Sequence, residues 1–179
     1  MLLYIHGFRS TPNSAKALQL KAHYGEKIEI ADFSHIPDEA ISQLQSMIET
    51  KQIEGLIASS LGGFYATWLS EKYQLRTALI NPSVRPYETL ARYLGENETY
   101  DGERFVWKQA YLEQLREYRI ERPTAENYLL FLQRGDEILD YRVALSYYEG
   151  AECVVEEGGN HRFEGFERHF DRIDAFFGI

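Results

Sequence analysis

Cysteine is almost absent from this sequence, since Cys153 is the only one among 179 residues. A single thiol cannot form an intrachain disulfide, and it cannot provide a zinc site built from several cysteines. No stretch approaches the ~20 consecutive apolar residues that a membrane-spanning helix requires. The amino terminus also lacks the basic flank and the long apolar core of a signal peptide. We therefore expect a cytoplasmic protein with no membrane span.

Positive charge is scarce as well. Lysine and arginine number 19 against 28 aspartate and glutamate residues, which gives a formal net charge of −9 at pH 7. Such a chain repels the phosphate backbone of nucleic acids, so we expect no nucleic-acid partner. Hydrophobic residues make up 44% of the chain, enough for a buried core, and the length corresponds to a single domain. The sequence leaves the oligomeric state open.

Short apolar runs alternate with helical patterns along most of the chain. Several of these runs, such as Leu2–Ile5, are apolar at every position, which is typical of strands covered by helices on both faces. Between Pro37 and Lys51, apolar residues recur at intervals of three and four and predict a helix. The pattern predicts an α/β fold with a mainly parallel sheet of about six strands. The expected strands are Leu2–Ile5, Lys27–Ala31, Gly55–Ser59, Thr77–Ile80, Tyr128–Gln133 and Glu152–Val155.

One stretch breaks this alternation. Residues 82–127 show no strand pattern, although their apolar residues recur at a fair helical spacing. We expect a helical cap inserted into a single domain that comprises residues 1–179. Aromatic residues are concentrated in the insertion, and Tyr87, Trp107 and Tyr111 are candidates to line an apolar substrate pocket. Alternatively, these rings pack the cap against the rest of the domain.

The segment 55–69 runs from an apolar strand through a turn of small residues directly into a helical pattern. This layout is typical of a nucleophile elbow, whose tight turn requires small residues two positions to either side of the nucleophile. Ser60 has Ala58 and Gly62 at these positions, whereas bulky residues flank Ser59 in the same way. Ser60 is therefore the candidate nucleophile. A strand-to-helix turn with a hydroxyl capping the helix gives a similar pattern without catalysis.

A nucleophilic serine needs a general base and an acid that orients this base. On an elbow of this kind, the acid and then a histidine follow the serine in the chain. Asp136 is the first carboxylate after the strand expected at 128–133 and lies on a glycine turn, so it is the candidate acid. Glu137 and Asp140 are the alternatives. Asp140 has a structural explanation as the N-cap of a helix that begins at Tyr141.

His161 lies in a glycine-rich loop after the last expected strand and is the candidate general base. An oxyanion hole requires two backbone N–H groups, one from the residue after the nucleophile and one from a loop after an early strand. These would be Leu61 and Phe8, because Gly7 permits a sharp turn after the first strand. We expect His6 to hold this loop by hydrogen bonding and to transfer no proton.

Five segments carry a resemblance that spans nearly the whole chain: His6–Phe8, Ser59–Phe64, Asn81–Pro82, Gly135–Asp136 and Gly159–His161. Together they resemble the YqiA-like esterases of the α/β-hydrolase superfamily. The resemblance implies an α/β-hydrolase fold and a carboxylesterase that cleaves short- to medium-chain acyl esters through a Ser-His-Asp triad and an acyl-enzyme. It also implies that the enzyme needs neither a metal nor an organic cofactor.

Three alternatives remain open at the level of sequence. Acyl-CoA or another acyl thioester could replace the ester as substrate, with Arg85, Arg92 and Arg104 of the insertion holding the phosphates of the coenzyme. An amide is a further substrate for the same three side chains. The alternative of another class is a ligand-binding protein that keeps the hydrolase scaffold without catalysis.

Overall fold

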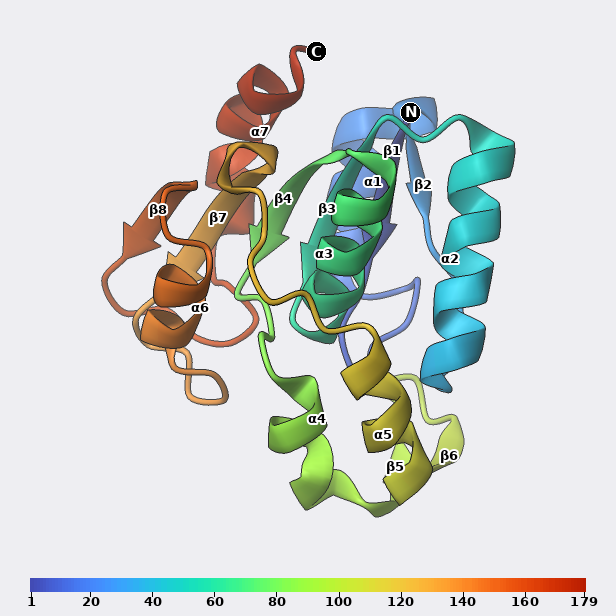
Figure 1. The fold of residues 1–179 in the computed structure, drawn as a ribbon. Coiled ribbons are helices and arrows are strands. Elements are labelled where there is room, and N and C mark those ends of the chain that lie inside the picture. The colour runs from blue at the N-terminus through green and yellow to red at the C-terminus, as the bar shows by residue number, and fades with distance from the viewer.

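A computed structural model describes residues 1–179. Its main sheet contains six parallel strands in the order β2-β1-β3-β4-β7-β8 (Figure 1). The predicted parallel sheet is confirmed, and the expected ends agree with the observed ones to within a residue. The strands are β1 (Leu2–Ile5), β2 (Ile28–Ile30), β3 (Gly55–Ser59), β4 (Arg76–Ile80), β7 (Tyr128–Gln133) and β8 (Glu152–Glu156).

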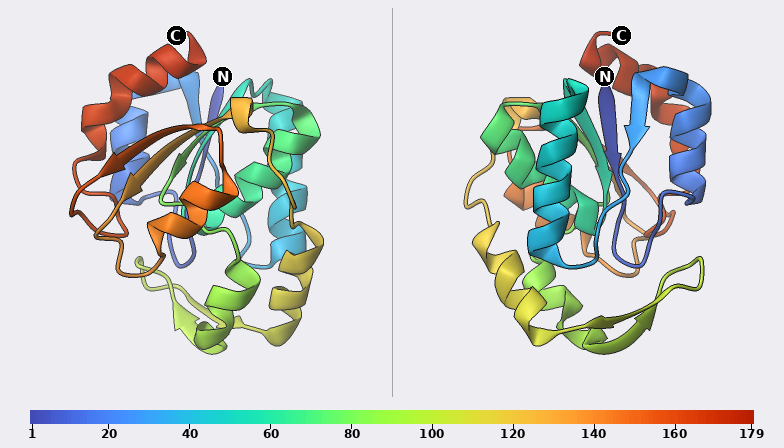
Figure 2. Two further views of the ribbon diagram at one scale, coloured as in Figure 1. Left: turned by 60° about the vertical axis from the view of Figure 1, so that its left-hand side comes forward. Right: turned by 90° about the vertical axis from the view of Figure 1, so that its right-hand side faces the viewer.

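Helices cover both faces of this sheet (Figure 2). Within β1, Leu2 and Tyr4 belong to one buried cluster while Leu3 and Ile5 belong to the other. Successive side chains of a strand point to opposite faces, so a strand that is apolar throughout is buried on both. One face carries α1 (Ala15–Tyr24) and α7 (Phe170–Phe177), and the other carries α2 (Pro37–Lys51), α3 (Leu61–Tyr73) and α6 (Tyr141–Tyr147).

The predicted helix between Pro37 and Lys51 is confirmed as α2. It starts with Pro37 in the first helical turn, where the missing N–H would have had no partner within the helix. Its buried residues include Ala40, Leu44 and Ile48, at the intervals of three and four that the sequence predicted. The other face of the helix is left to solvent.

The segment between β4 and β7 forms a separate layer at the lower end of the molecule in Figure 1. The expectation that it contains no strand was wrong, because β5 and β6 pair there as an antiparallel hairpin. In β6, Phe105 and Trp107 are buried and their neighbours exposed, which is a strand pattern of only four residues. Its elements are α4 (Pro86–Thr89), the 3-10 turn η2 (Leu90–Tyr93), β5 (Gly95–Glu98), β6 (Arg104–Trp107) and α5 (Gln109–Glu117).

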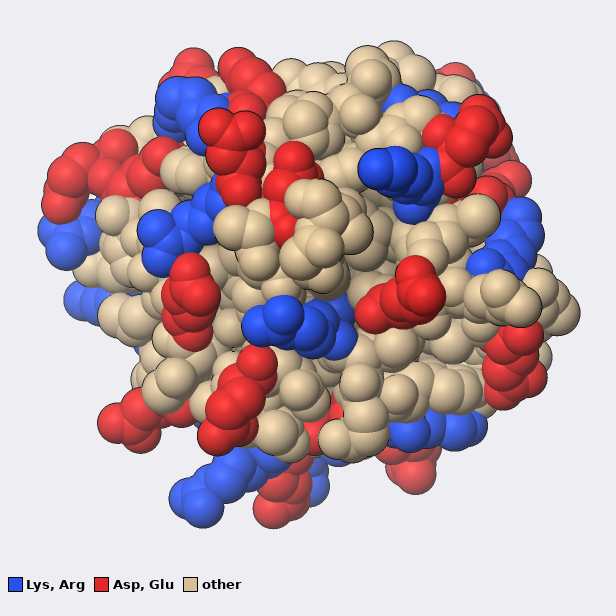
Figure 3. All heavy atoms as spheres, turned by 90° about the horizontal axis from the view of Figure 1, so that it is seen from above, with Lys and Arg blue, Asp and Glu red and all other residues tan.

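The carboxyl ends of the parallel strands meet at the edge of the sheet that faces this insertion (Figure 1). Ligands of open parallel sheets bind outside this edge. The opposite end of the molecule, viewed in Figure 3, shows acidic and basic side chains interspersed with uncharged surface. None of the helices has both the length and the apolar character needed to cross a membrane.

Candidate active site

Ser60 lies at the turn between β3 and α3, with φ 51° and ψ −124°. A positive φ is uncommon for a residue with a side chain and marks a strained turn. The turn also brings Gly62 against β1, where an added Cβ would lie 2.2 Å from the carbonyl oxygen of Ile5. On the other flank Ala58 is fully buried. The packing therefore leaves no room for a side chain at Gly62, and it encloses the small side chain of Ala58.

Ser60 and its neighbour Ser59 have different hydrogen-bond partners. The hydroxyl of Ser59 lies 2.9 Å from the phenolic oxygen of Tyr4. Burial raises the pKa of Tyr4 to about 12, so this phenol stays protonated at neutral pH. The hydroxyl of Ser60 instead lies 3.0 Å from Nε2 of His161. Only Ser60 therefore has an imidazole as its partner.

Ser60, His161 and Asp136 form one hydrogen-bonded series. Nδ1 of His161 lies 2.9 Å from Oδ2 and 3.0 Å from Oδ1 of Asp136. The N–H groups of Ile138 and Leu139 donate to Oδ1 of Asp136 at 2.9 and 2.8 Å and hold the carboxylate toward the imidazole. The Asp136 side chain is only 2% exposed. When Nδ1 donates to this carboxylate, Nε2 is left free to accept the Ser60 proton.

The two alternative carboxylates do not touch the imidazole. Asp140 accepts a hydrogen bond of 3.0 Å from the N–H of Arg142 and caps α6, which confirms its predicted structural role. Glu137 accepts the backbone N–H of His161 at 2.9 Å. This contact fixes the main chain of His161, whereas the imidazole ring is hydrogen-bonded to Asp136. The sequence offered no signal for it.

Two buried amides, Asn81 and Gln133, hold the histidine loop, and the sequence alone assigned neither of them this role. Asn81, at the end of β4, donates from Nδ2 to the carbonyls of Asn160 and His161, each at 3.1 Å. Its Oδ1 accepts the N–H of Gln133 at 3.0 Å, and Oε1 of Gln133 accepts the N–H groups of Asn160 and Glu164. Unpaired buried amides are costly, so this network pins the loop in place. The sequence did offer one signal for both residues, because each is a polar residue at the end of an apolar strand.

The backbone N–H groups of Phe8 and Leu61 have no acceptor within the protein. Leu61 is the first residue of α3, where free N–H groups and the helix dipole favour negative charge. Gly7 lets the loop after β1 approach the serine, because an added Cβ would lie 2.9 Å from Cβ of Ser60. As expected, His6 hydrogen-bonds within this loop, with Nδ1 3.1 Å from the carbonyl of Gly7. Two free N–H donors are therefore available beside Ser60.

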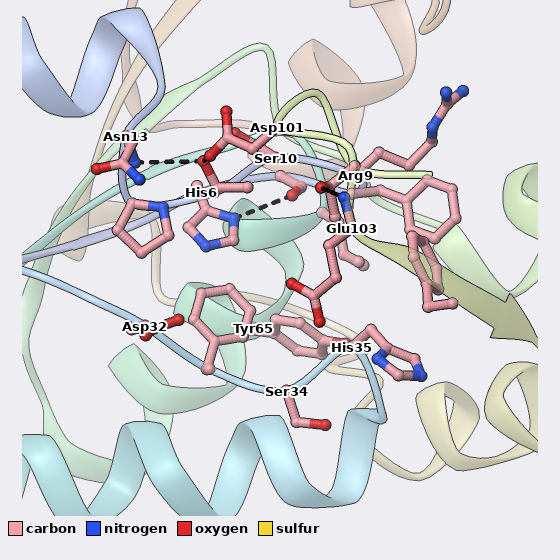
Figure 4. Close-up of a pocket in the computed structure, with 18 of the residues that line it drawn as sticks. His6, Arg9, Ser10, Asn13, Asp32, Ser34, His35, Tyr65, Asp101 and Glu103 are labelled. Atoms are coloured by element: carbon pink, nitrogen blue, oxygen red, sulfur yellow. Dashed lines mark hydrogen bonds between the residues drawn. The ribbon is translucent and has the colours of Figure 1, made fainter. Parts of the chain in front are cut away.

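A cavity of about 780 Å³ opens beside these two residues (Figure 4). Its walls come from the loop after β1, the segment between β2 and α2, the start of α3 and the hairpin of the insertion. Only five of its 19 lining residues are hydrophobic, and three are carboxylates, Asp32, Asp101 and Glu103. The cavity is thus polar, in contrast to the apolar pocket that the aromatic residues suggested.

The aromatic residues singled out from the sequence lie behind this cavity or away from it. Trp107 is 1% exposed and packs edge-on against Phe8, with ring centroids 5.0 Å apart. Tyr111 packs on Trp107 at 5.3 Å, and Tyr87 packs on Phe64 at 6.3 Å. The contacts of Trp107 with Phe8 and of Tyr87 with Phe64 join the insertion to the rest of the domain, which was the structural alternative. Direct contact of these three rings with a substrate stays a prediction.

The tip of the hairpin spans the two loops that flank Ser60. The ring of Tyr100 lies between two guanidinium groups, 5.6 Å from that of Arg9 and 5.4 Å from that of Arg162. The N–H of Tyr100 donates to the carbonyl of Arg9 at 3.0 Å, and Nε of Arg9 donates to the carbonyl of Glu98 at 2.8 Å. The insertion therefore connects the loop of Phe8 with the loop of His161.

The parallel sheet, the helices on both its faces and the strand-to-helix elbow define the α/β-hydrolase fold. A putative hydrolase from Agrobacterium vitis shares this fold with a TM-score of 0.76 and 17% identity, covering 98% of this chain and 87% of that chain. Est1E from Butyrivibrio proteoclasticus has a TM-score of 0.73 and 16% identity, over 99% of this chain and 85% of its own. The mouse alpha/beta hydrolase domain-containing protein 10 has a TM-score of 0.71 and 18% identity, over 99% of this chain and 89% of its own.

The chain belongs to the family described as "Uncharacterised protein family (UPF0227)", whose profile matches residues 1–178. A UPF0227 protein of Citrobacter koseri is 27% identical over 187 residues, covering 98% of both chains. The UPF0227 protein YcfP of Salmonella newport has the same identity over the same coverage. Together with the shared fold, these relatives confirm the predicted resemblance to the YqiA-like family.

Proposed function

We propose that the protein is a serine hydrolase that cleaves carboxylic esters of short- to medium-chain acyl groups. The observation that carries this proposal is the hydrogen-bonded series from Ser60 through His161 to the buried carboxylate of Asp136. A nucleophile, a base and an orienting acid are the three groups that acyl transfer by serine requires. The likeness to solved esterases and hydrolases supports the same class of reaction.

In the proposed reaction, Nε2 of His161 takes the proton from Ser60 as Oγ attacks the acyl carbonyl carbon. Asp136 holds the Nδ1–H and stabilises the imidazolium that forms. The carbonyl oxygen becomes an oxyanion, which accepts hydrogen bonds from the free N–H groups of Phe8 and Leu61. These donors are fixed by the backbone before the substrate arrives, so they need no reorganisation when the charge develops.

Collapse of the tetrahedral intermediate breaks the bond to the leaving alcohol oxygen. Nε2 of His161 returns its proton to this oxygen, and the acyl group stays on Oγ of Ser60 as an ester. The same imidazole then deprotonates a water molecule, which attacks the acyl-enzyme and releases the carboxylic acid. Ser60 regains its proton, and the three side chains are back in their starting states.

Hydrolysis of p-nitrophenyl butyrate tests this proposal, because the two adjacent serines provide matched variants. We expect Ser60→Ala to lower kcat/KM at least a thousandfold, roughly the loss seen when a member of such a triad is removed. Ser59→Ala removes only the hydrogen bond to Tyr4 and should keep kcat/KM within a few-fold of wild type. Thermal unfolding of both variants controls for the fold.

Loss of activity in Ser59→Ala with full activity in Ser60→Ala would contradict the proposal. A wild-type protein that turns over neither esters nor thioesters, yet binds an apolar ligand, would favour the non-catalytic alternative.

A further inference from the structure

We propose that the cavity beside Phe8 and Leu61 binds the acyl part of the substrate, and that this acyl group carries a positively charged amine. The inference rests on the proposed function, since it names the substrate class for the same serine. It departs from the apolar acyl chain that the aromatic residues suggested. Three observations carry it: the position of the cavity, the charge of its walls and an unpaired acceptor in its lining.

The position of the cavity selects the acyl part of the substrate. The leaving oxygen must receive a proton from His161, so the leaving group lies on the side of the imidazole. Phe8 and Leu61 line the cavity, whereas His161 does not. Gly7 also lines it, and a Cβ added at Gly7 would lie 3.4 Å from Oγ of Ser60. The cavity therefore extends from the oxyanion hole away from the leaving group.

The charge of the walls favours a cation. Asp32 follows β2, while Asp101 and Glu103 belong to the hairpin, so two separate parts of the chain direct carboxylates to one cavity (Figure 4). No lysine lines it. Burial lowers the pKa of His35 from its ordinary value, which favours the uncharged imidazole. Arg9 is the one arginine of the lining, so a single guanidinium is set against three carboxylates, and it is held at the hairpin tip by the carbonyl of Glu98 and the ring of Tyr100.

The unpaired acceptor is Nε2 of His6. The side chain of this residue lines the cavity, the residue is 6% exposed, and Nε2 has no hydrogen-bond partner in the protein. Nδ1 lies 3.1 Å from the carbonyl of Gly7, and a carbonyl only accepts, so the ring proton is on Nδ1. Nε2 is therefore an acceptor that lacks a donor. In Figure 4 its ring is seen between Asp32 and Asp101.

An ammonium group satisfies all of these features at once. It carries three N–H donors and a positive charge, and the wall offers it three carboxylates and the imidazole acceptor of His6. A carboxylate ligand would meet like charge and find no free donor at His6. A neutral alkyl chain would leave the acceptors to water alone and gain no attraction from the walls.

Three p-nitrophenyl esters of similar acyl length test the inference: those of 6-aminohexanoic acid, heptanoic acid and the monoester of adipic acid. They place an ammonium, a methyl and a carboxylate group at the far end of the chain. At low ionic strength we expect kcat/KM to fall about tenfold from the cationic to the neutral ester, and further for the anionic ester. The preference should shrink in 0.5 M salt, because the carboxylates are exposed to solvent.

Variants that each remove one negative charge test which residues cause the preference for the cationic ester. Asp32→Asn and Glu103→Gln should each lower the ratio of cationic to neutral kcat/KM by about threefold. Glu149→Gln removes the same charge from an exposed position outside the cavity and should keep the wild-type ratio. Asp101 is left intact because the hydroxyl of Thr11 donates to it, and its loss would loosen the hairpin tip.

If the heptanoate ester is hydrolysed, two results would overturn this inference while leaving the proposed function intact. One is an equal kcat/KM for the cationic and neutral esters. The other is a loss of the cationic-to-neutral ratio in Glu149→Gln as large as that in Asp32→Asn and Glu103→Gln. Failure to hydrolyse any of the three esters would overturn the proposed function, and the acyl subsite with it. Turnover of the neutral ester therefore separates the two failures.

Discussion

Two regions of the molecule meet at Ser60, and they are held in different ways. The loop of His161 is fixed by buried hydrogen bonds, foremost those of Asn81, which is 3% exposed. The hairpin of the insertion is held at its tip by surface contacts such as the stacking of Arg9 on Tyr100, which is 67% exposed. Exposed contacts contribute little and exchange readily with water, whereas buried ones resist displacement. The sheet domain thus fixes the proposed chemistry, and the insertion shapes the surface that would select the substrate.

Glycine substitutions give the largest expected difference between the two regions. A Cβ at Gly62 would lie 2.2 Å from the carbonyl oxygen of Ile5, so Gly62→Ala forces the elbow away from β1. We expect a loss of about 3 kcal/mol or more in the free energy of unfolding, measured in urea. Gly102→Ala, in the hairpin, has only the Glu98 carboxylate nearby at 3.8 Å and costs about 1 kcal/mol of backbone strain. Equal losses of stability in the two variants would contradict the view that the elbow is more tightly packed than the hairpin.

Asparagine substitutions give the next largest difference. Asn81→Ala removes two hydrogen bonds to the histidine loop, so the imidazole loses its alignment with Ser60. We expect kcat to fall about a hundredfold while KM changes little, because a displacement near 1 Å has this effect on a catalytic group. Asn97→Ala is the matched control, since Asn97 donates its own two hydrogen bonds within the hairpin region.

The kinetics of these two variants with p-nitrophenyl butyrate measure the effect, and circular dichroism checks the fold. A purely structural role for Asn81 would lower the amount of folded protein without changing kcat per folded molecule. Loss of kcat in Asn97→Ala equal to that in Asn81→Ala would show that the insertion controls the chemistry as strongly as the sheet.

The smallest expected effect concerns pH. Nζ of Lys16 donates to the carbonyl of Arg162 at 2.8 Å, and burial lowers the pKa of Lys16 to about 8. An unfolded lysine keeps its proton up to a pH of about 10.4, so between these values the unfolded chain binds more protons. The contribution of Lys16 to the free energy of unfolding should therefore rise by about 1 kcal/mol as pH increases from 8 to 9. Lys16→Met should remove this rise.

Lys108→Met in the insertion is the control for this measurement and should keep the wild-type dependence on pH. Urea unfolding of wild type and both variants at pH 8, 8.5 and 9 supplies the comparison. The difference from wild type cancels the tyrosines and Cys153, whose pKa values burial raises and which lower the free energy of unfolding over the same range. A difference between wild type and Lys16→Met that stays constant from pH 8 to 9 would contradict the lowered pKa of Lys16.

The sheet and the central side chains of the site could be predicted because their signals are local. Strands buried on both faces are apolar at every position, and Leu2–Ile5 is one of them. Ser60 was distinguished from Ser59 by the size of the residues two positions away, and the contact that a Cβ at Gly62 would make shows the physical basis of this rule. Their order in the chain was enough to expect Asp136 and His161 near Ser60.

The hairpin and the cavity could not be predicted because their signals are weak or distant. The strand β5 reads Gly-Glu-Asn-Glu and has no apolar residue, so its pairing with β6 leaves no pattern in the sequence. Asp32 and Glu103 lie far apart in the chain and meet only through the fold. The same holds for the contact of Asn81 with His161.

Mass spectrometry after treatment with a fluorophosphonate shows directly whether Ser60 is an activated nucleophile. An activated serine displaces fluoride from this reagent and keeps the phosphonate as a stable ester, whereas an ordinary serine does not react. We expect one label per chain, on the peptide of residues 55–69 and at Ser60, and no label in His161→Ala or Ser60→Ala. An unlabelled wild-type protein, or a label on Ser59, would contradict this expectation.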